Sequence, residues 1–259
     1  MEQSSALPWN RRRWLGAAGT LAAATALPIP QIFASSRVLG ANARPGIGFI
    51  GTGGRAGAHI DICLKFKEQG RCDTVAVCDV YRPRVEAAAA RTGGKIYRDY
   101  RELLADGGVD LVCIATPDRH HAPQALAAVR AGKDVYVEKP LTHWSQMDLA
   151  AELGDEAERL KRIVQVGTQY VADEAYAKAR ALIEQGIVGK IVHVQLGYFR
   201  RGDWGERMPI PDPNAKPGPD LDWEQFLGDA PKVPFDVSRF FQWRLYWDYA
   251  GGPATDLLV

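Results

Sequence analysis

Two short apolar stretches in the first half of the chain have the length and composition of buried β-strands. Residues 46–50 form the first and residues 74–78 the second, which ends at Asp79. Between them a glycine-rich segment, residues 51–57, leads into residues 58–64, whose polar and apolar positions fit an amphipathic helix. The order is a strand, a glycine turn, a helix and a second strand that is followed by an acidic residue. This order predicts a dinucleotide-binding site.

Each part of the glycine segment suits that role. Gly51 permits a tight turn after the strand, and Gly53 leaves no Cβ between the backbone and a pyrophosphate. Ala56 is small enough for close packing of helix on strand, and free N–H groups at the helix start can face phosphates. Asp79 is placed to accept from a ribose hydroxyl. We therefore predict cofactor contacts from Gly51, Thr52, Gly53, Gly54, Arg55, Ala56 and Asp79.

Further strands and helices alternate along residues 83–166. The patterns predict helices over 83–91, 99–105, 122–131 and 144–161, and strands over 110–115, 134–137 and 163–166. Such alternation predicts the α/β class, with a doubly wound parallel sheet of the Rossmann type. Ligands bind outside the carboxyl ends of the strands in these sheets. We therefore expect Gly51, Asp79, Thr116 and Glu138-Lys139 to gather along one edge.

The pattern changes after Gly167. Residues 174–185 have helical spacing, and residues 190–199 alternate with period two, which predicts a strand with one exposed face. A proline-rich irregular stretch, 209–219, precedes an aromatic run over 240–247. We predict a dinucleotide-binding domain over 44–168 and part of a C-terminal substrate and oligomerisation domain over 169–259. This second region would be the incomplete beginning of an α/β domain with a large open sheet.

The first forty residues have a different composition. Three arginines, Arg11 to Arg13, precede Trp14-Leu15 and an uncharged stretch, residues 16–28, that is rich in Ala and Leu. A positive segment before a short apolar one indicates a secretory signal, because the apolar run is too short for a membrane span. The arginines followed by apolar residues resemble a twin-arginine export signal; an uncleaved membrane anchor is the alternative. We expect residues 1–43 to be signal and linker, and the protein to be periplasmic or otherwise extracytoplasmic.

Overall composition changes this picture little. The chain has 259 residues, a formal net charge of +1 and 24% charged residues, which is ordinary for a globular protein and gives no support for nucleic acid as a partner. Its four cysteines lack zinc-ligand spacing, and the histidines form no HExxH or HxxxH pattern. We therefore predict no metal site.

Several motifs together resemble the Gfo/Idh/MocA oxidoreductases, a family that includes glucose-fructose oxidoreductase and inositol dehydrogenases. The resemblance covers residues 47–259, and its most specific motif is Glu138-Lys139-Pro140 at a strand end. Asp118 stands where the family often has Asn. The other motifs are the glycine segment, Thr116-Pro117-Asp118-Arg119-His120-His121, Val166-Gly167-Thr168-Gln169, Trp243-Arg244 and Gly251-Gly252-Pro253-Ala254-Thr255-Asp256.

The resemblance implies a nicotinamide cofactor with Lys139 beside its reactive ring, Glu138 fixing the nicotinamide side and Asp256 shaping the substrate pocket. A catalytic histidine four positions after Asp256 would be the residue that follows Val259, so we expect a chain truncated at its C-terminus. The full-length protein would be a homo-oligomer. By the same resemblance, cofactor contacts would come from Arg84, Thr116, Pro117, His121, Glu138, Lys139, Gln169, Trp243 and Arg244, and the catalytic residues would be Lys139 and Asp256.

Some roles have two interpretations. His121 either contacts the cofactor or only makes hydrogen bonds at a helix start, and His59 and His120 are expected to be surface or packing residues. Trp223, Trp243 and Trp247 either stack on a sugar ring or belong to the core. Asp79 favours NAD, with NADP as the alternative because Arg82 and Arg84 can hold a 2′-phosphate.

The expected function is oxidation or reduction of a sugar, cyclitol or related polyol on a tightly bound nicotinamide. Beside a positively charged oxidised ring, the Lys139 ammonium would lose its proton more readily, so the lysine would accept the hydroxyl proton or stabilise the alkoxide. One alternative is a glycoside hydrolase that uses bound NAD for a transient oxidation. The other is a non-catalytic sugar- or nucleotide-binding protein.

Overall fold

The structure is a computed structural model that describes residues 44–195, 197 and 208–257. The predicted export signal lies outside the described residues, as do most of the last four positions of the predicted strand 190–199. Among the helices of the described part, none is long and apolar enough to cross a membrane.

The predicted parallel sheet is confirmed, with six strands in the order β3-β2-β1-β4-β5-β6. Four of the strands match predicted ones closely, and β6 lies within one residue of its prediction. The missed strand, β3, has only three residues and packs at the sheet edge, which gives a weak sequence pattern. The strands are β1 (Gly46–Ile50), β2 (Asp73–Cys78), β3 (Lys95–Tyr97), β4 (Leu111–Ile114), β5 (Asp134–Glu138) and β6 (Val164–Gly167).

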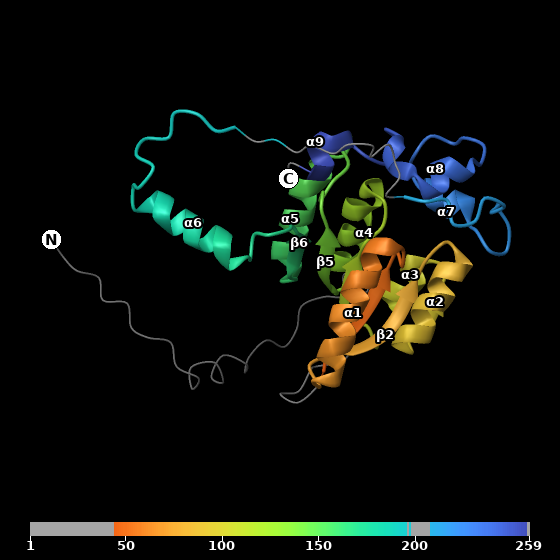
Figure 1. Cartoon of the computed structure of the whole chain (residues 1–259). Coiled ribbons are helices and arrows are strands. Elements are labelled where there is room, and N and C mark those ends of the chain that lie inside the picture. The colour runs from red at the N-terminus through yellow and green to blue at the C-terminus, as the bar shows by residue number, and fades with distance from the viewer. Residues whose placement is uncertain (1–43, 196, 198–207, 258–259) are drawn as a thin grey trace, which may run out of the picture. The chain divides into compact units, whose positions relative to one another are not determined.

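Helices pack on both faces of this sheet, and Figure 1 labels each of them. They are α1 (Gly54–Glu68), α2 (Arg82–Thr92), α3 (Tyr100–Ala105), α4 (Asp118–Arg130) and α5 (Asp148–Leu160). Successive strand residues point to opposite faces. Phe49 therefore packs in the cluster with α1 and α2, whereas its neighbour Ile50 packs in the cluster with α3, α4 and α5.

The register brings the carboxyl ends of the central strands to one level. Ile50 pairs with Cys78 on one side and with Ile114 on the other. Glu138, at the end of β5, pairs with Gly167 of β6. The residues that follow these pairs therefore meet along one edge of the sheet, as the sequence predicts.

A third apolar cluster contains the aromatic residues of the C-terminal part. Tyr81, which follows β2, packs there with Trp223, Phe226, Phe240 and Tyr249. Backbone hydrogen bonds join the same regions, since Arg82 N donates to Asp220 O at 2.8 Å and Asp222 N to Val80 O at 2.9 Å. The helices beyond β6 are α6 (Glu174–Glu184), α7 (Trp223–Leu227), α8 (Val237–Phe241), the 3-10 helix η1 (Trp243–Leu245) and α9 (Gly252–Leu257).

Two predicted elements are corrected. Residues 190–195 and 197, the described part of the expected strand 190–199, contain no strand, and those with an assigned exposure are exposed. Among the described residues beyond β6 no further strand is found that could pair with this segment, and period-two alternation alone does not fix a strand without a partner. The helix expected over 144–161 begins at Asp148, because residues 143–147 form a turn tied by a hydrogen bond from Gln146 N to His143 O.

Candidate functional site

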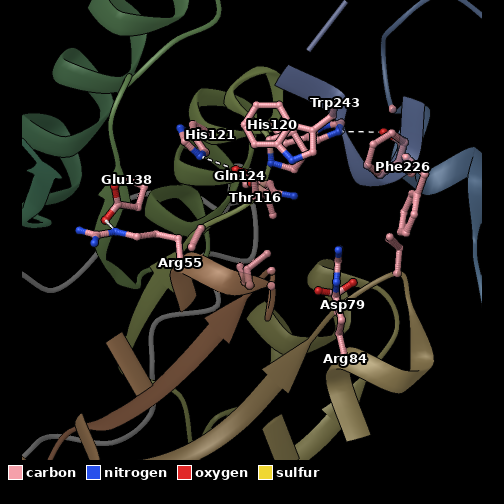
Figure 2. A pocket seen from close by; sticks show the side chains of 18 of the residues that line it. Arg55, Asp79, Arg84, Thr116, His120, His121, Gln124, Glu138, Phe226 and Trp243 are labelled. Atoms are coloured by element: carbon pink, nitrogen blue, oxygen red, sulfur yellow. Dashed lines mark hydrogen bonds and ion pairs between the residues drawn. The ribbon is translucent and has the colours of Figure 1, made fainter. Parts of the chain in front are cut away.

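A cavity of about 890 Å³ opens where the strands of the sheet end. One wall comes from the sheet edge and the first turns of α1 and α4, and the other from residues 208–244, including Phe226, Phe240 and Trp243. Figure 2 shows the labelled side chains of both walls around this space. Thirteen of the predicted site residues line it: Gly51, Gly53, Gly54, Arg55, Asp79, Arg84, Thr116, Pro117, His121, Glu138, Lys139, Trp243 and Arg244.

The glycine turn has the geometry that a pyrophosphate needs. Gly51 has φ +79°, and a Cβ there would lie 2.7 Å from Thr116 Cγ2 and 2.8 Å from Ala115 O. A Cβ on Gly54 would meet no protein atom within 4 Å, which leaves room for a ligand against the backbone. Ala56 is buried, as its predicted packing role requires, but it does not line the cavity, so its predicted contact with the cofactor stays a prediction.

The first turn of α1 also lacks a side-chain cap, unlike four other helices of the described part. Gly53 occupies the N-cap position of α1 without a side-chain hydrogen bond, whereas α3, α6, α7 and α8 are each capped by an aspartate. The uncapped N–H groups and the helix dipole suit a phosphate group. The residues present therefore fit a dinucleotide.

Asp79 ties the glycine turn to the end of β2. Its Oδ2 accepts from Thr52 N at 2.8 Å and from Thr52 Oγ1 at 3.1 Å, and its Oδ1 accepts from Tyr81 N at 2.9 Å. Thr52 does not line the cavity itself. It instead holds Asp79, which does. Each carboxylate oxygen has more than one lone pair, so Asp79 keeps acceptor capacity toward the cavity.

Arg84 extends over the aromatic cluster beside the glycine turn. Its guanidinium carbon lies 5.2 Å from the ring centre of Phe241 and 5.5 Å from that of Phe240. The same carbon would lie 3.8 Å from a Cβ on Gly53. Arg82, by contrast, pairs with Asp220 and Glu86. Arg84 is thus the arginine of this pair that faces the cavity.

His121 is buried and joins two loops of the cavity wall. Its Nδ1 lies 2.7 Å from Pro140 O and its Nε2 lies 2.8 Å from Thr116 O. Thr116 in turn donates its hydroxyl to Gln124 Oε1 at 2.8 Å. His121 therefore makes the hydrogen bonds expected at the start of α4, and because it also lines the cavity, its contact with the cofactor stays a prediction.

Lys139 lines the cavity and forms an ion pair with Asp256, which does not line the cavity itself. Lys139 Nζ lies 2.8 Å from Asp256 Oδ1 and also donates to the backbone oxygen of Asp256. Arg244 Nε lies 3.6 Å from the same carboxylate oxygen, and the Arg244 guanidinium stacks over Trp243 with 4.2 Å between its central carbon and the ring centre. The two residues predicted to be catalytic are therefore in direct contact.

Asp118 is the residue of this region that sequence analysis undervalued. It is 1% exposed, and both carboxyl oxygens lack a hydrogen-bond partner. Burial raises the pKa of Asp118 to about 7, a shift that Arg244 and Lys139 oppose and that Asp256 reinforces. Near neutral pH, Asp118 is therefore protonated in a large fraction of the molecules, whereas an ordinary aspartate is ionised. The departure from Asn was visible in the sequence, but its burial was not.

The other predictions have mixed outcomes. Gln169 is exposed and does not line this cavity. Trp223 belongs to the core, Trp243 lines the cavity and Trp247 is exposed. His120 lines the cavity and its Nε2 lies 2.8 Å from Phe226 O. Burial lowers the pKa of His120 to about 4, so the ring is neutral and donates to that carbonyl group.

His59, expected at the surface or in packing, packs against Tyr136 and also lies 2.6 Å from Glu138 Oε1 through its Nε2. No local sequence signal identifies this contact, because the two residues are far apart along the chain. The described residues contain no group of three or more His, Cys, Asp or Glu side chains placed to hold a metal ion.

Comparison with known proteins identifies the first domain. Residues 46–168 match the family model described as an oxidoreductase family with an NAD-binding Rossmann fold. An inositol 2-dehydrogenase of Rubrobacter xylanophilus is 33% identical over 165 residues, which are 63% of this chain and 46% of that enzyme. A glycosyl hydrolase family 109 protein of a Shewanella strain is 27% identical over 170 residues, covering 61% of this chain and 36% of that protein.

Solved structures agree with this assignment. A levoglucosan dehydrogenase in complex with NADH is 27% identical and aligns with a TM-score of 0.51, over 57% of this chain and 41% of that one. The alignments thus span less than half the length of these relatives. The family match, the strand order and the uncapped glycine turn lead to one conclusion: residues 46–168 belong to the Gfo/Idh/MocA oxidoreductase family as its NAD-binding Rossmann domain.

Proposed function

We propose that the protein is an NAD-dependent oxidoreductase that acts on a hydroxyl group of a sugar, cyclitol or related polyol. The observation that carries the proposal is Lys139, which lines the same cavity as the glycine turn and whose Nζ lies 2.8 Å from Asp256 Oδ1. Homologues named as inositol and levoglucosan dehydrogenases support the substrate class.

The residues of the chain divide the work between binding and proton handling. The glycine turn and the first N–H groups of α1 would hold the pyrophosphate, and Asp79 a ribose hydroxyl. When bound, the nicotinamide would accept or supply the hydride. Lys139, oriented by Asp256, would bind the substrate oxygen and either accept its proton or stabilise the charge that develops there.

A panel assay tests this proposal. Full-length protein would be supplied with inositols, hexoses and anhydrosugars plus NAD, and NADH formation would be followed at 340 nm. The proposal expects turnover of at least one polyol and its loss in Lys139→Met, with NADH binding retained. Binding of NADH without turnover of any polyol by the wild type would instead favour a non-catalytic binding protein.

Tight retention of the cofactor is a second element of the proposal. Side chains of residues 208–244 enclose the cavity opposite the glycine turn, and the arginine-rich leader resembles a signal for export of folded proteins. A cofactor bound before export would then remain on the protein and be reduced by one sugar and reoxidised by another. Full-length protein purified from periplasm without bound nicotinamide would contradict this.

The similarity to a glycosyl hydrolase family 109 protein supports one alternative function. In that case the same site would oxidise a sugar carbon transiently, so that the glycosidic bond breaks by elimination and no reduced cofactor accumulates. Release of p-nitrophenol from aryl glycosides without net NADH formation would decide for this alternative.

A further inference from the structure

Glu138 is held from α1 by two side chains that bind the same carboxylate oxygen. Arg55 Nε donates to Glu138 Oε1 at 2.7 Å, and His59 Nε2 lies 2.6 Å from the same atom. Figure 2 shows the contact between Arg55 and Glu138. Residues four positions apart share one face of a helix, so the first two turns of α1 direct both donors at the end of β5.

The two donors differ in their surroundings. The Arg55 side chain is 43% exposed, whereas those of His59 and Glu138 are 12% and 6% exposed. The His59 ring also packs edge-on against Tyr136 of β5, with 5.0 Å between ring centres. His59 is therefore the partner that is fixed by packing, and Arg55 alone would hold the carboxylate less firmly.

Glu138 is an anion in spite of its burial. Desolvation opposes its ionisation, but hydrogen bonds from His59 and Arg55 outweigh that effect and lower the pKa of Glu138. The bond to this carboxylate oxygen requires a hydrogen on His59 Nε2. Among the described residues, Glu138 Oε2 has no hydrogen-bond partner, and Glu138 lines the cavity.

We propose that His59 is a positioning residue of the active site, which together with Arg55 fixes Glu138 and thereby the Lys139 that follows it. The proposal rests on the proposed function for the role of Lys139. The chain of contacts runs from the glycine turn through α1 and Glu138 to Lys139 and Asp256. Small displacements of a catalytic group reduce turnover strongly, so a looser Glu138 would affect the chemical step more than cofactor binding.

The test compares variants of His59 in the full-length protein. His59→Leu removes the donor, whereas His59→Gln keeps an amide N–H that can reach Glu138. We expect His59→Leu to lower kcat about 10-fold or more with the Kd for NADH changed less than about 3-fold, because a hydrogen bond to a charged group is lost. His59→Gln should restore kcat to within about 3-fold of the wild type.

Two further variants complete the test. Glu138→Gln should resemble His59→Leu, and the combination of His59→Leu with Glu138→Gln should cost little more than either alone, because the two residues act as one unit. The exposed His193→Gln is the matched control and should leave kcat unchanged. If His59→Leu does not fold, His59→Phe keeps an aromatic ring against Tyr136 without a donor and gives the same comparison with His59→Gln.

A second readout separates this inference from the proposed function. The fluorescence emission of bound NADH reports the surroundings of its ring and requires no substrate. If the wild type turns over no polyol, the proposed function fails, but His59→Leu should still shift this emission while His59→Gln does not. Wild-type kcat and unshifted emission in His59→Leu would overturn the inference.

Discussion

The two walls of the cavity are built by different means. The sheet wall includes the last residue of a paired strand, Glu138, and residues that directly follow such strands, Gly51 and Asp79, so the register of the sheet sets their positions. The opposite wall includes aromatic side chains on helices of five residues, α7 and α8, which pack in one cluster with Tyr81. Changes in the first wall should therefore alter chemistry and binding, and changes in the second should alter closure of the cavity.

The largest effect is expected at Lys139 of the sheet wall. Lys139→Met should reduce turnover by about 10²–10⁴-fold, because the group that handles the substrate proton is lost, while NADH still binds. Steady-state kinetics and an NADH titration measure the two quantities. Lys178→Ala, an exposed lysine on α6, is the control. Turnover within threefold of the wild type would remove Lys139 from the mechanism.

Asp118 tests how burial beside the sheet wall affects stability. Its pKa is raised from 3.8 to about 7, so the folded state binds this proton more tightly, and stability falls as pH rises from about 4 through 7. Asp118→Asn should remove that loss and be more stable than the wild type at pH 8 by roughly 2–4 kcal/mol.

Urea unfolding at pH 5 and pH 8 measures this difference. The advantage of Asp118→Asn should shrink at the lower pH, where the wild-type carboxyl group is protonated in the folded state. The exposed Asp155→Asn provides the control and should show no such change. An equal stability difference at both pH values would contradict the assignment of a buried neutral carboxyl group.

The glycine turn allows stability and binding to be separated. Gly51→Ala should destabilise the fold by about 1–3 kcal/mol, because Gly51 has a positive φ and a Cβ there would press on Thr116 and Ala115. Gly54→Ala should be neutral or slightly stabilising, yet weaken NADH binding because its methyl group enters the ligand space. Unchanged NADH affinity in Gly54→Ala would place the pyrophosphate elsewhere.

The smallest effect is expected where the second wall is tied to the first. The Tyr81 hydroxyl donates to Asp212 Oδ2 at 2.9 Å. Tyr81→Phe keeps the ring in the aromatic cluster but removes this bond, which should lower the free energy of unfolding by about 1 kcal/mol. NADH release should become several-fold faster. Where the chemical step is slower than NADH release, kcat should not change. Stopped-flow displacement of NADH measures the rate. An unchanged release rate would mean that this contact does not limit opening.

The difference between positions set by a strand end and positions set by distant contacts explains which features the sequence could predict. Strand ends carry local signals, so Gly51, Asp79, Thr116 and Lys139 were predicted to share an edge, and they do line one cavity. The bond from His59 to Glu138 joins residues 79 positions apart, and the pKa of Asp118 depends on its burial and on the charges of Arg244 and Asp256, which lie far along the chain. No local pattern carries such information. The described part of the segment expected as a strand over 190–199 is not a strand for a related reason, since a strand depends on its partner.

A structure of the full-length protein with bound NAD tests the central claim most directly. The account predicts the pyrophosphate against the first turn of α1, at Gly53 and Gly54, and the nicotinamide ring beside Lys139 and Glu138. A cofactor bound in the reverse direction, with its adenine beside Lys139, or one bound outside the cavity, would contradict it.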